Sequence, residues 1–385
     1  MRFDFATASR IIFGSGTLRE IGPLARELGR KVLIVTGRDP ARAKKLANIL
    51  NGHGIGTLTL STSGEPDLET VQRGKLLATS ENCDFVIAIG GGSALDAGKA
   101  IAAMLTNHGE LLDYLEVIGR GRSLGNPSAP FIAIPTTAGT GSEVTRNAVL
   151  ASPEHRVKVS LRSPFMLPKI ALVDAELTYE LPTSITASTG LDALTQLIEP
   201  YVSSRANPIT DAICVDGIRR VARSLRIAFD KGQNATTART DMAAASLFGG
   251  MALANAGLGA VHGFAGPIGG MFPAPHGAVC AALLPHVMEA NLDALRHREQ
   301  HNPALPRYYR IARMLTGEPK ATPEAGVEWV RKLVADFEIP SLRSYNITGE
   351  HISDLVEKAA KASSMKSNPI ALTPTELAGI LERAL

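Results

Sequence analysis

Residues 85–100 have the sequence FVIAIGGGSALDAGKA, an apolar run that ends in three glycines and continues into an alanine-rich segment. A short apolar run rich in β-branched residues is typical of a buried strand, and an alanine-rich segment is typical of a helix. Glycines at such a junction let the backbone approach an anion closely, and the first N–H groups of the helix are free to bind it. The segment therefore predicts a strand, a phosphate-binding turn and a helix, although an ordinary glycine-rich turn would have the same composition.

The same alternation extends to both sides of this segment. We expect strands at 31–36, 57–61, 85–89, 131–134 and 170–173, helices near 40–52, 66–80 and 93–106, and a hairpin of 146–151 with 156–162. Strands that alternate with helices predict a parallel sheet covered on both faces. After residue 182 strand-like runs nearly vanish, and helical stretches follow, among them 184–204, 238–264 and 276–290. We therefore expect a Rossmann-like α/β dinucleotide-binding domain over residues 1–182 and an all-helical domain over residues 183–385.

The composition excludes several classes of protein. Of 385 residues, 45% are hydrophobic and 20% are charged, which are ordinary values for a globular chain. The net charge of +3 is too small to indicate a nucleic-acid partner. The cysteines, Cys83, Cys214 and Cys280, are odd in number and far apart, which favours a reducing, cytoplasmic compartment over a disulfide framework. The apolar run 249–272 is mainly Gly and Ala and contains His262, so we expect a buried helix and no membrane association.

A second candidate cofactor loop, PTTAGTGSEVT at residues 135–145, follows the expected strand 131–134. Its hydroxyl groups and glycines suit hydrogen bonding to a polar ligand, although Ser, Thr and Gly are equally common in capped turns. Two polar loops at the carboxyl ends of strands in one parallel sheet are what a bound dinucleotide requires. The pair of loops therefore supports a dinucleotide site in the first half of the chain.

The helical half contains a group of candidate metal ligands. Asp192 and Gln196 are four residues apart and so share one face of a helix, and His262 and His276 follow on other segments. One carboxylate and two imidazoles can surround a divalent cation and leave a position open for a substrate. Each residue taken alone is more often a cap or a hydrogen-bonded core group, and this alternative stays open.

Four motifs in this order resemble the iron-containing (group III) alcohol dehydrogenase superfamily. They are GGGS with Asp96 at 90–96, PTTAGTGSEVT at 135–145, TGLDAL at 189–194, and VHG, PHG and LLPHV within 261–287. The superfamily includes propanediol oxidoreductases and maleylacetate reductases, and the resemblance runs through nearly the whole chain. It implies a nucleotide-binding domain, a helical metal-binding domain, an active site in the cleft between them, and a homodimer.

The resemblance also assigns residues to roles. Gly91, Gly92 and Ser93 match the family's pyrophosphate loop, and we expect Asp96, just beyond it, to help orient that loop at the cofactor. Thr136, Thr137 and Thr140 match the family's second cofactor loop, and Lys158 matches a lysine near the cofactor. Asp192, His262 and His276 match three of the four family metal ligands.

This chain departs from the family at two positions. The fourth metal ligand is a His in the family and Gln196 here, and an amide oxygen is a poorer ligand than imidazole for iron or zinc. A second family His, implicated in proton relay, is Gly266 here. A three-ligand iron or zinc site and a metal-free enzyme are both compatible with these changes. The missing imidazole at 266 predicts extra space beside the nicotinamide and a bulkier substrate, and it leaves the catalytic acid–base group unassigned.

The end of the first long strand bears on the choice of cofactor. NAD-preferring relatives have an acidic residue there that binds the ribose diol, whereas this chain has Gly37 followed by Arg38. A guanidinium in place of a carboxylate should tolerate a 2′-phosphate, so we expect NADP(H) to be accepted or preferred. Asp39 could still serve NAD if the loop shifts.

The function expected from these features is reversible hydride transfer between a small-molecule alcohol and NAD(P)⁺, assisted by a metal that polarises the carbonyl. Three alternatives remain. One is a metal-independent oxo-acid reductase of the maleylacetate type, although the segment 368–370 (NPI) lacks the arginine of those enzymes. The others are a lyase of the dehydroquinate synthase type and a non-catalytic nucleotide-binding relative.

Overall fold

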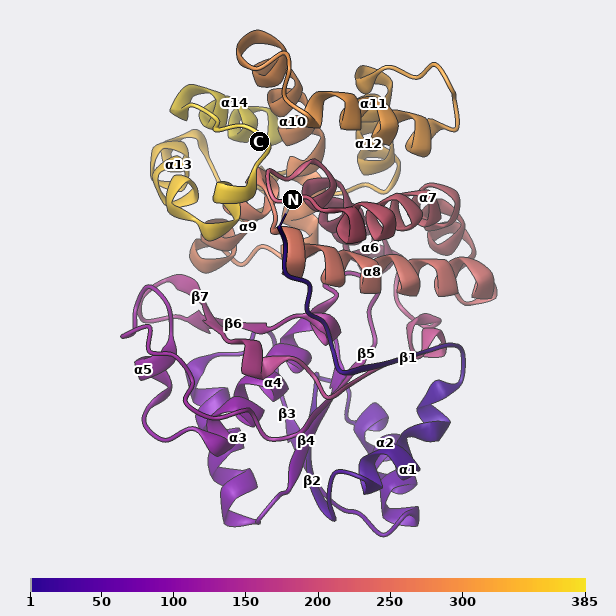
Figure 1. The fold of residues 1–385 in the computed structure, drawn as a ribbon, viewed down its shortest axis with the longest axis vertical. Coiled ribbons are helices and arrows are strands. Elements are labelled where there is room, and N and C mark those ends of the chain that lie inside the picture. The colour runs from indigo at the N-terminus through magenta and orange to yellow at the C-terminus, as the bar shows by residue number, and fades with distance from the viewer. Residues whose placement is uncertain (1) are drawn as a thin grey trace. The chain divides into compact units, whose positions relative to one another are not determined.

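A six-stranded parallel sheet forms the centre of the α/β part of the chain in the computed structural model, which describes residues 2–385 (Figure 1). Its strands are β1 (Arg10–Phe13), β2 (Lys31–Thr36), β3 (Gly56–Ser61), β4 (Phe85–Gly90), β5 (Phe131–Pro135) and β8 (Ile170–Val173), in the order β1-β8-β5-β4-β2-β3. The predicted α/β class is confirmed. Strand β1 was not expected, because it is a four-residue strand at the edge of the sheet with no fully buried residue.

Helices cover both faces of this sheet, because alternate side chains of each strand point to opposite faces. Val32 and Ile34 of β2 belong to a core shared with α1 (Ile21–Arg26) and α2 (Pro40–Gly52). Leu33 and Val35 belong to a second core shared with α3 (Leu68–Ser80) and α4 (Gly92–Thr106). Burial on both faces explains why these strands are continuous apolar runs in the sequence.

The adjacent strands β2 and β4 lead to helices on opposite faces of the sheet, α2 and α4. Such a switch point in a parallel sheet opens a crevice at the carboxyl ends of the strands, where nucleotides bind. Thr36 pairs with Ile89, and Gly90 pairs with Pro135, so β2, β4 and β5 end at the same level. The loops after these three strands therefore begin side by side. The expected hairpin is also present, as β6 (Asn147–Ser152) and β7 (Val157–Arg162).

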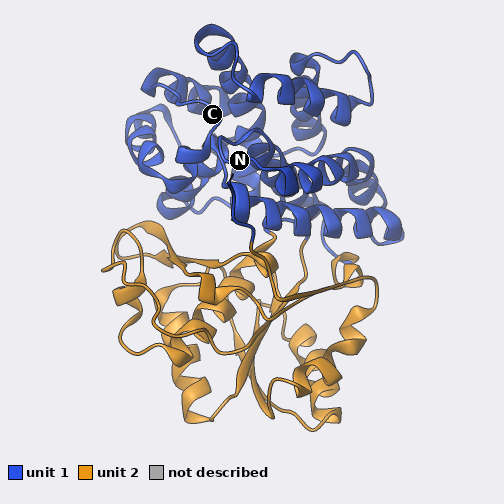
Figure 2. Ribbon diagram, in the orientation of Figure 1, with its two compact units in different colours: residues 1–5, 138–140, 180–385 blue, residues 6–137, 141–179 orange. Residues whose placement is uncertain are grey.

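The chain from residue 180 onward is helical and has its own hydrophobic core. Its helices are α6 (Thr183–Val202), α7 (Pro208–Lys231), α8 (Thr236–Ala256), α9 (Ala260–Met271), α10 (His276–Arg298), α11 (Ala304–Thr316), α12 (Pro323–Asp336), α13 (Ile352–Lys361) and α14 (Pro374–Ala384). One compact unit contains the residues up to Phe5, 138–140 and 180–385, and the other contains 6–137 and 141–179 (Figure 2). The division of the chain into domains at 182/183 stays a prediction.

The single helix expected over 238–264 is wrong: α8 ends at Ala256, α9 begins at Ala260, and the two are bent by 98°. Gly257 has a φ of +75°, which L side chains rarely adopt, and a Cβ at this position would collide with Ser367. A Cβ at Gly259 would lie 2.9 Å from Oε1 of Glu199. The bend therefore brings a new helix start close to Glu199.

One helix among the described residues, α10, is long and apolar enough to cross a membrane, and 83% of its apolar window is buried. The pair α8 and α9 passes the same test only if the two bent helices are counted as one span. Burial of this kind is typical of core helices.

Candidate functional site

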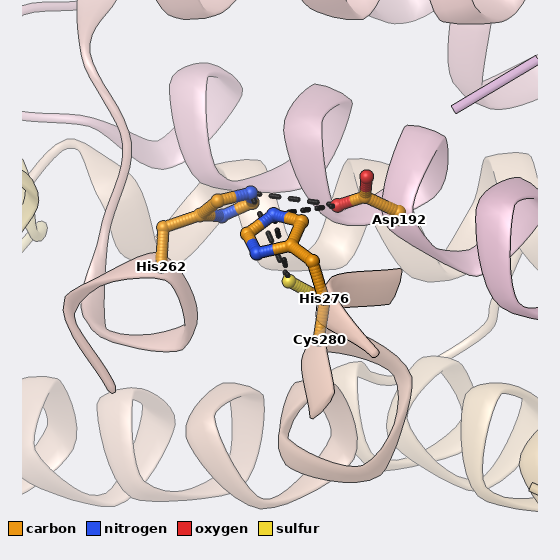
Figure 3. Close-up of side chains that lie close together, drawn as sticks. All are labelled: Asp192, His262, His276 and Cys280. Carbon is orange, nitrogen blue, oxygen red and sulfur yellow. Dashed lines mark hydrogen bonds and ion pairs between the residues drawn. The ribbon is translucent and has the colours of Figure 1, made fainter. Parts of the chain in front are cut away.

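Three of the predicted metal ligands, Asp192, His262 and His276, lie together in the helical part of the chain, and Cys280 joins them (Figure 3). Asp192 is in the middle of α6, His262 is in the first turn of α9, and His276 opens α10 one turn before Cys280. Oδ1 of Asp192 lies 3.5 Å from Nε2 of His262 and 3.7 Å from Nε2 of His276. Sγ of Cys280 lies 3.6 Å from Nε2 of His276 and 3.9 Å from Nε2 of His262.

The donor atoms of these four side chains are suited to bind a divalent cation. Oδ1 of Asp192 is buried and has no hydrogen-bond partner, which is costly for a carboxylate oxygen unless another positive group satisfies it. The candidate ligand atoms all lie within 4.8 Å of one another. One carboxylate, two imidazoles and a thiol are a donor set that suits zinc or iron. The residues therefore fit a bound metal, and their role as ligands stays a prediction.

Glu199 orients His262. Its Oε2 lies 2.7 Å from Nδ1 of His262, and its Oε1 accepts a 2.7 Å hydrogen bond from the backbone N–H of Val261. A carboxylate at Nδ1 holds the proton on that nitrogen, so the lone pair of Nε2 faces the cluster. Glu199 was not predicted, although it lies seven residues after Asp192 and thus two turns along the same face of α6.

The pKa shifts show that the cluster favours positive charge. Burial raises the pKa of Asp192, but the charge of His276, the nearby His262 and the polar side chain of Gln196 together lower it below its ordinary value. Burial lowers the pKa of His262, but the charges of Cys280 and Glu199 raise it well above its ordinary value. Burial also lowers the pKa of His276, but the charges of Cys280 and Asp192 raise it above its ordinary value. The same field that favours an imidazolium would favour a metal ion.

Gln196, the fourth predicted ligand, lies one turn after Asp192 in α6 and is buried. Its side chain lowers the pKa of Asp192, and its Oε1 has no hydrogen-bond partner. It is therefore a neighbour of the cluster, and its role as a ligand stays a prediction.

Gly266, the other departure from the family, lies four residues after His262 on the same helix face. A Cβ built at Gly266 would meet no atom within 4 Å. The missing side chain therefore leaves open space on the side of α9 that carries His262.

The predicted cofactor residues gather at the carboxyl ends of β2, β4 and β5. Gly91 caps α4 without a side-chain hydrogen bond, so the first N–H groups of the helix are available to an anion. A Cβ at Gly90 would lie 3.4 Å from the backbone nitrogen of Gly37, and a Cβ at Gly91 would lie 3.4 Å from Cγ2 of Thr137. The structure thus brings together the loops that carry Gly37, Arg38, Gly91, Gly92, Ser93, Thr136 and Thr137. Thr140 lies in the segment 138–140, which is grouped with the helical unit.

Asp96 and Lys99 of α4 hold the second loop in place. Oδ1 of Asp96 accepts a 2.6 Å hydrogen bond from Oγ of Ser142, and its Oδ2 accepts one from the backbone N–H of Val149. Nζ of Lys99 is buried and donates to the carbonyl oxygen and Oγ of Ser142, at 2.8 and 2.9 Å, and to Oγ1 of Thr145. Burial lowers the pKa of Lys99. Asp96 therefore holds the second loop in place, and its role in cofactor binding stays a prediction.

Glu143, in the same loop, is a buried carboxylic acid that the sequence did not single out. Its Oε2 has no hydrogen-bond partner. Burial raises its pKa to about 7, against a backbone hydrogen bond and the charge of Lys99, which both lower it. Only the structure reveals this environment, because nothing in the sequence marks residue 143 as buried.

Two further predicted cofactor residues are Lys158, which is ion-paired, and Arg38, which is exposed. Lys158 of β7 forms a 3.0 Å ion pair with Glu65. Arg38 is exposed at the start of the loop after β2, and the next residue, Asp39, accepts a 2.9 Å hydrogen bond from the backbone N–H of Ala41 as the N-cap of α2. Asp39 is thus already engaged in capping a helix.

Comparison with known proteins gives concordant matches along the chain. The family described as "Iron-containing alcohol dehydrogenase" matches residues 8–175, and "Fe-containing alcohol dehydrogenase family, C-terminal" matches residues 186–385. The chain is 35% identical to alcohol dehydrogenase 4 of Saccharomyces cerevisiae (strain YJM789), covering 97% of this chain and 96% of that protein. It is 36% identical to 1,3-propanediol dehydrogenase of Klebsiella pneumoniae, covering 99% and 98%. The solved alcohol dehydrogenase from Oenococcus oeni matches with a TM-score of 0.92 and 34% identity over 100% of both chains.

Proposed function

Because the chain belongs to the iron-containing alcohol dehydrogenase family, we propose that it interconverts an alcohol and an aldehyde or ketone with NAD(P) as the hydride carrier. The observation that carries this proposal is the buried cluster of Asp192, His262 and His276, whose unpartnered carboxylate oxygen and two imidazole nitrogens converge. Such a cluster is costly in a folded protein unless a cation occupies it. We expect the substrate to be a small molecule and the protein to be a cytoplasmic homodimer.

A divalent metal, when bound by these side chains, supplies a Lewis acid that polarises a carbonyl and lowers the pKa of an alcohol. The chain's own contribution is to hold the donors in position. Asp192 brings negative charge, and Glu199 keeps the proton of His262 on Nδ1, at 2.7 Å. The family's relay imidazole is replaced by Gly266, so we propose that the alcohol proton leaves through water or through a cofactor hydroxyl.

The loops of the α/β part are proposed to bind and orient the dinucleotide, which carries the hydride. The N-terminus of α4 at Gly91, Gly92 and Ser93 would bind the pyrophosphate. The loop with Thr136 and Thr137 would bind the nicotinamide half, held by the hydrogen bonds of Asp96 and Lys99 to Ser142.

We also propose that the enzyme accepts NADP(H) at least as well as NAD(H). Asp39 caps α2, so turning its carboxylate toward a ribose diol would cost the helix about 1 kcal/mol. Arg38 is exposed and can pair with a 2′-phosphate. Steady-state kinetics with both cofactors tests this, and Arg38→Ala should raise KM for NADP(H) while leaving KM for NAD(H) nearly unchanged. A strong NAD preference in the unchanged protein would refute the proposal.

The open space at Gly266 supports a substrate larger than a short aliphatic alcohol. Gly266→Leu fills that space, so it should lower kcat/KM for long or branched alcohols more than for short ones. Equal losses for all alcohols would count against this assignment.

The central experiment is an assay of NAD(P)H oxidation with a panel of aldehydes, ketones and oxo-acids, combined with metal analysis of protein purified without chelators. We expect turnover of aldehydes or ketones that chelation removes and zinc or iron restores. Turnover of oxo-acids alone, insensitive to chelation, would instead support the metal-independent reductase. No turnover with tight nucleotide binding would support the non-catalytic relative.

A further inference from the structure

We propose that the thiolate of Cys280 is the fourth protein ligand of the metal, in place of the imidazole that is absent at Gln196, and that it makes the site select zinc over iron. The proposal rests on the proposed function only in requiring a resident metal. It concerns which side chains hold the metal and which metal they prefer.

The distances around Cys280 fit a tetrahedral site. A tetrahedron built with metal–nitrogen and metal–oxygen lengths of about 2.0–2.2 Å and a metal–sulfur length of about 2.3 Å has edges of roughly 3.3–3.6 Å. The recorded edges are 3.5 and 3.7 Å from Oδ1 of Asp192 to the two histidine nitrogens. The edges from Sγ to the same nitrogens are 3.6 and 3.9 Å. Four of the six edges thus lie within a few tenths of an ångström of those of such a tetrahedron, and the other two are shorter than 4.8 Å (Figure 3).

The position of Cys280 follows from the helix that carries it. His276 and Cys280 are four residues apart on α10, so both side chains lie on one face. Cys280 is fully buried, and the two other cysteines of the described chain lie elsewhere, Cys214 in α7 and Cys83 after α3. The thiol is thus placed by regular helix geometry against the ring of His276.

Gln196 is a weaker candidate for the same coordination position. An amide oxygen is neutral, whereas a thiolate adds a second negative charge to that of Asp192. Two anionic ligands neutralise a divalent ion, which matters in a buried site where residual charge is costly.

The donor set then predicts the metal. Sulfur and imidazole ligands favour zinc, and zinc also stands above iron(II) in the general order of affinities. On binding, the thiol loses its proton to solvent and its sulfur lone pair forms the bond to the metal, so the metal keeps its oxidation state.

X-ray absorption at the zinc edge of the reconstituted, unsubstituted protein tests the proposal directly. We expect one sulfur at about 2.3 Å with nitrogen and oxygen neighbours. The cobalt(II)-substituted protein should show a sulfur-to-cobalt charge-transfer band in the near ultraviolet. In competition experiments zinc should displace iron(II). A first shell of nitrogen and oxygen alone would overturn the proposal whether or not any variant folds.

Matched alanine variants separate ligation from packing. Cys280→Ala should lose the charge-transfer band and weaken zinc binding by about 10-fold or more, whereas Cys214→Ala, at an equally buried thiol, should retain both. Gln196→His combined with Cys280→Ala should regain metal binding without the sulfur signature. If Gln196→Ala loses the metal and Cys280→Ala keeps it, the amide is the ligand and the proposal is wrong.

The same samples distinguish this proposal from the proposed function. A zinc shell without sulfur in an enzyme that oxidises alcohols would overturn the role of Cys280 and leave the function standing. A sulfur-ligated zinc in a protein that turns over no alcohol, aldehyde or ketone would support Cys280 and overturn the function.

Discussion

Glu199 connects a helix start to a predicted metal ligand, His262, through its two carboxylate oxygens. One oxygen accepts from the backbone N–H of Val261 and the other lies against Nδ1 of His262, both at 2.7 Å. No neutral side chain of the same shape offers two acceptors to these two groups. An amide has one oxygen and an NH₂ donor, which would force the histidine proton onto the nitrogen that faces the cluster.

We therefore expect Glu199→Gln to weaken metal binding by about 10- to 100-fold, as is usual when the partner of a ligating histidine is lost. Competition with a chelator of known affinity measures the change. Glu350→Gln, at an exposed carboxylate, serves as the control and should bind metal normally. Unchanged affinity in Glu199→Gln would show that His262 does not need this partner.

Glu143 should make the stability of the protein depend on pH. Its pKa is raised by burial to about 7 in the folded state, against an ordinary value of 4.5. Because the folded protein holds this proton more tightly than the unfolded chain, the contribution of Glu143 is fully present below the ordinary pKa. It is lost as the pH rises through about 7, where the acid must ionise while buried.

Glu143→Gln removes this titration, so the variant should gain stability relative to the unsubstituted protein between about pH 5 and about pH 8, by up to about 3 kcal/mol. Urea unfolding across this range measures the difference. The exposed Glu154→Gln should show no such trend. Parallel stability curves for Glu143→Gln and the unsubstituted protein would mean that Lys99 or the loop backbone compensates the buried charge.

At the scale of single elements, α4 is the helix that carries the proposed pyrophosphate site at its N-terminus. Gly98 allows it to approach the sheet closely: a Cβ there would lie 2.7 Å from Cβ of Ala88 and 2.9 Å from Cε2 of Phe131. Ala88 belongs to β4 and is fully buried, so it cannot move aside alone. An added methyl group must therefore push α4 away from the sheet.

Gly98→Ala should lower the free energy of unfolding by about 1–3 kcal/mol, because overpacking outweighs the gain in helix propensity. It should also raise KM for the nucleotide, since the displaced helix carries the proposed pyrophosphate site. Denaturant melts and cofactor kinetics measure the two effects. Gly52→Ala, at a helical glycine with no atom within 4 Å, should be neutral or stabilising. If Gly98→Ala and Gly52→Ala lose the same amount of stability, close packing at Gly98 is not the cause.

The elements differ in how well the sequence predicted them. Strands β2, β4, β5 and β8 are mainly apolar runs, and the bounds of all the strands from β2 to β8 agree with the structure within about one or two residues. The break between α8 and α9 was missed, because glycines inside an alanine-rich run do not reveal that the backbone must turn there. The same miss concealed Glu199, whose partner Val261 has a free N–H only because a helix begins at that point.

For the molecule as a whole, we propose that residues 1–182 and 183–385 are separate folding domains with separate ligands. Calorimetry should then show two transitions. NAD(P)⁺ should raise the temperature of one, and removal of the metal should lower the other. Gly98→Ala should move only the transition that the nucleotide moves. A single transition shifted by both ligands would contradict the division.

Motifs far apart in the chain could be assigned to one site only through the family resemblance. Spacing alone left Asp192, His262 and His276 as possible caps or core groups, and the structure brings their ligand atoms within 4.8 Å of one another. Cys280 escaped notice because an isolated cysteine has no spacing pattern other than its four-residue distance from His276. Contacts between helices, rather than patterns within them, define this part of the site.

The location of the cluster late in the chain has a consequence for how the protein is made. Lys158 is the last of the predicted nucleotide-binding residues along the chain, whereas the last residue of the cluster is Cys280. A chain growing on the ribosome exposes its amino-terminal segments first, and these can fold while the rest is still being synthesised. The predicted nucleotide loops can thus form before α10 has emerged, and the proposed metal can be bound by the complete cluster only at a later step of biogenesis.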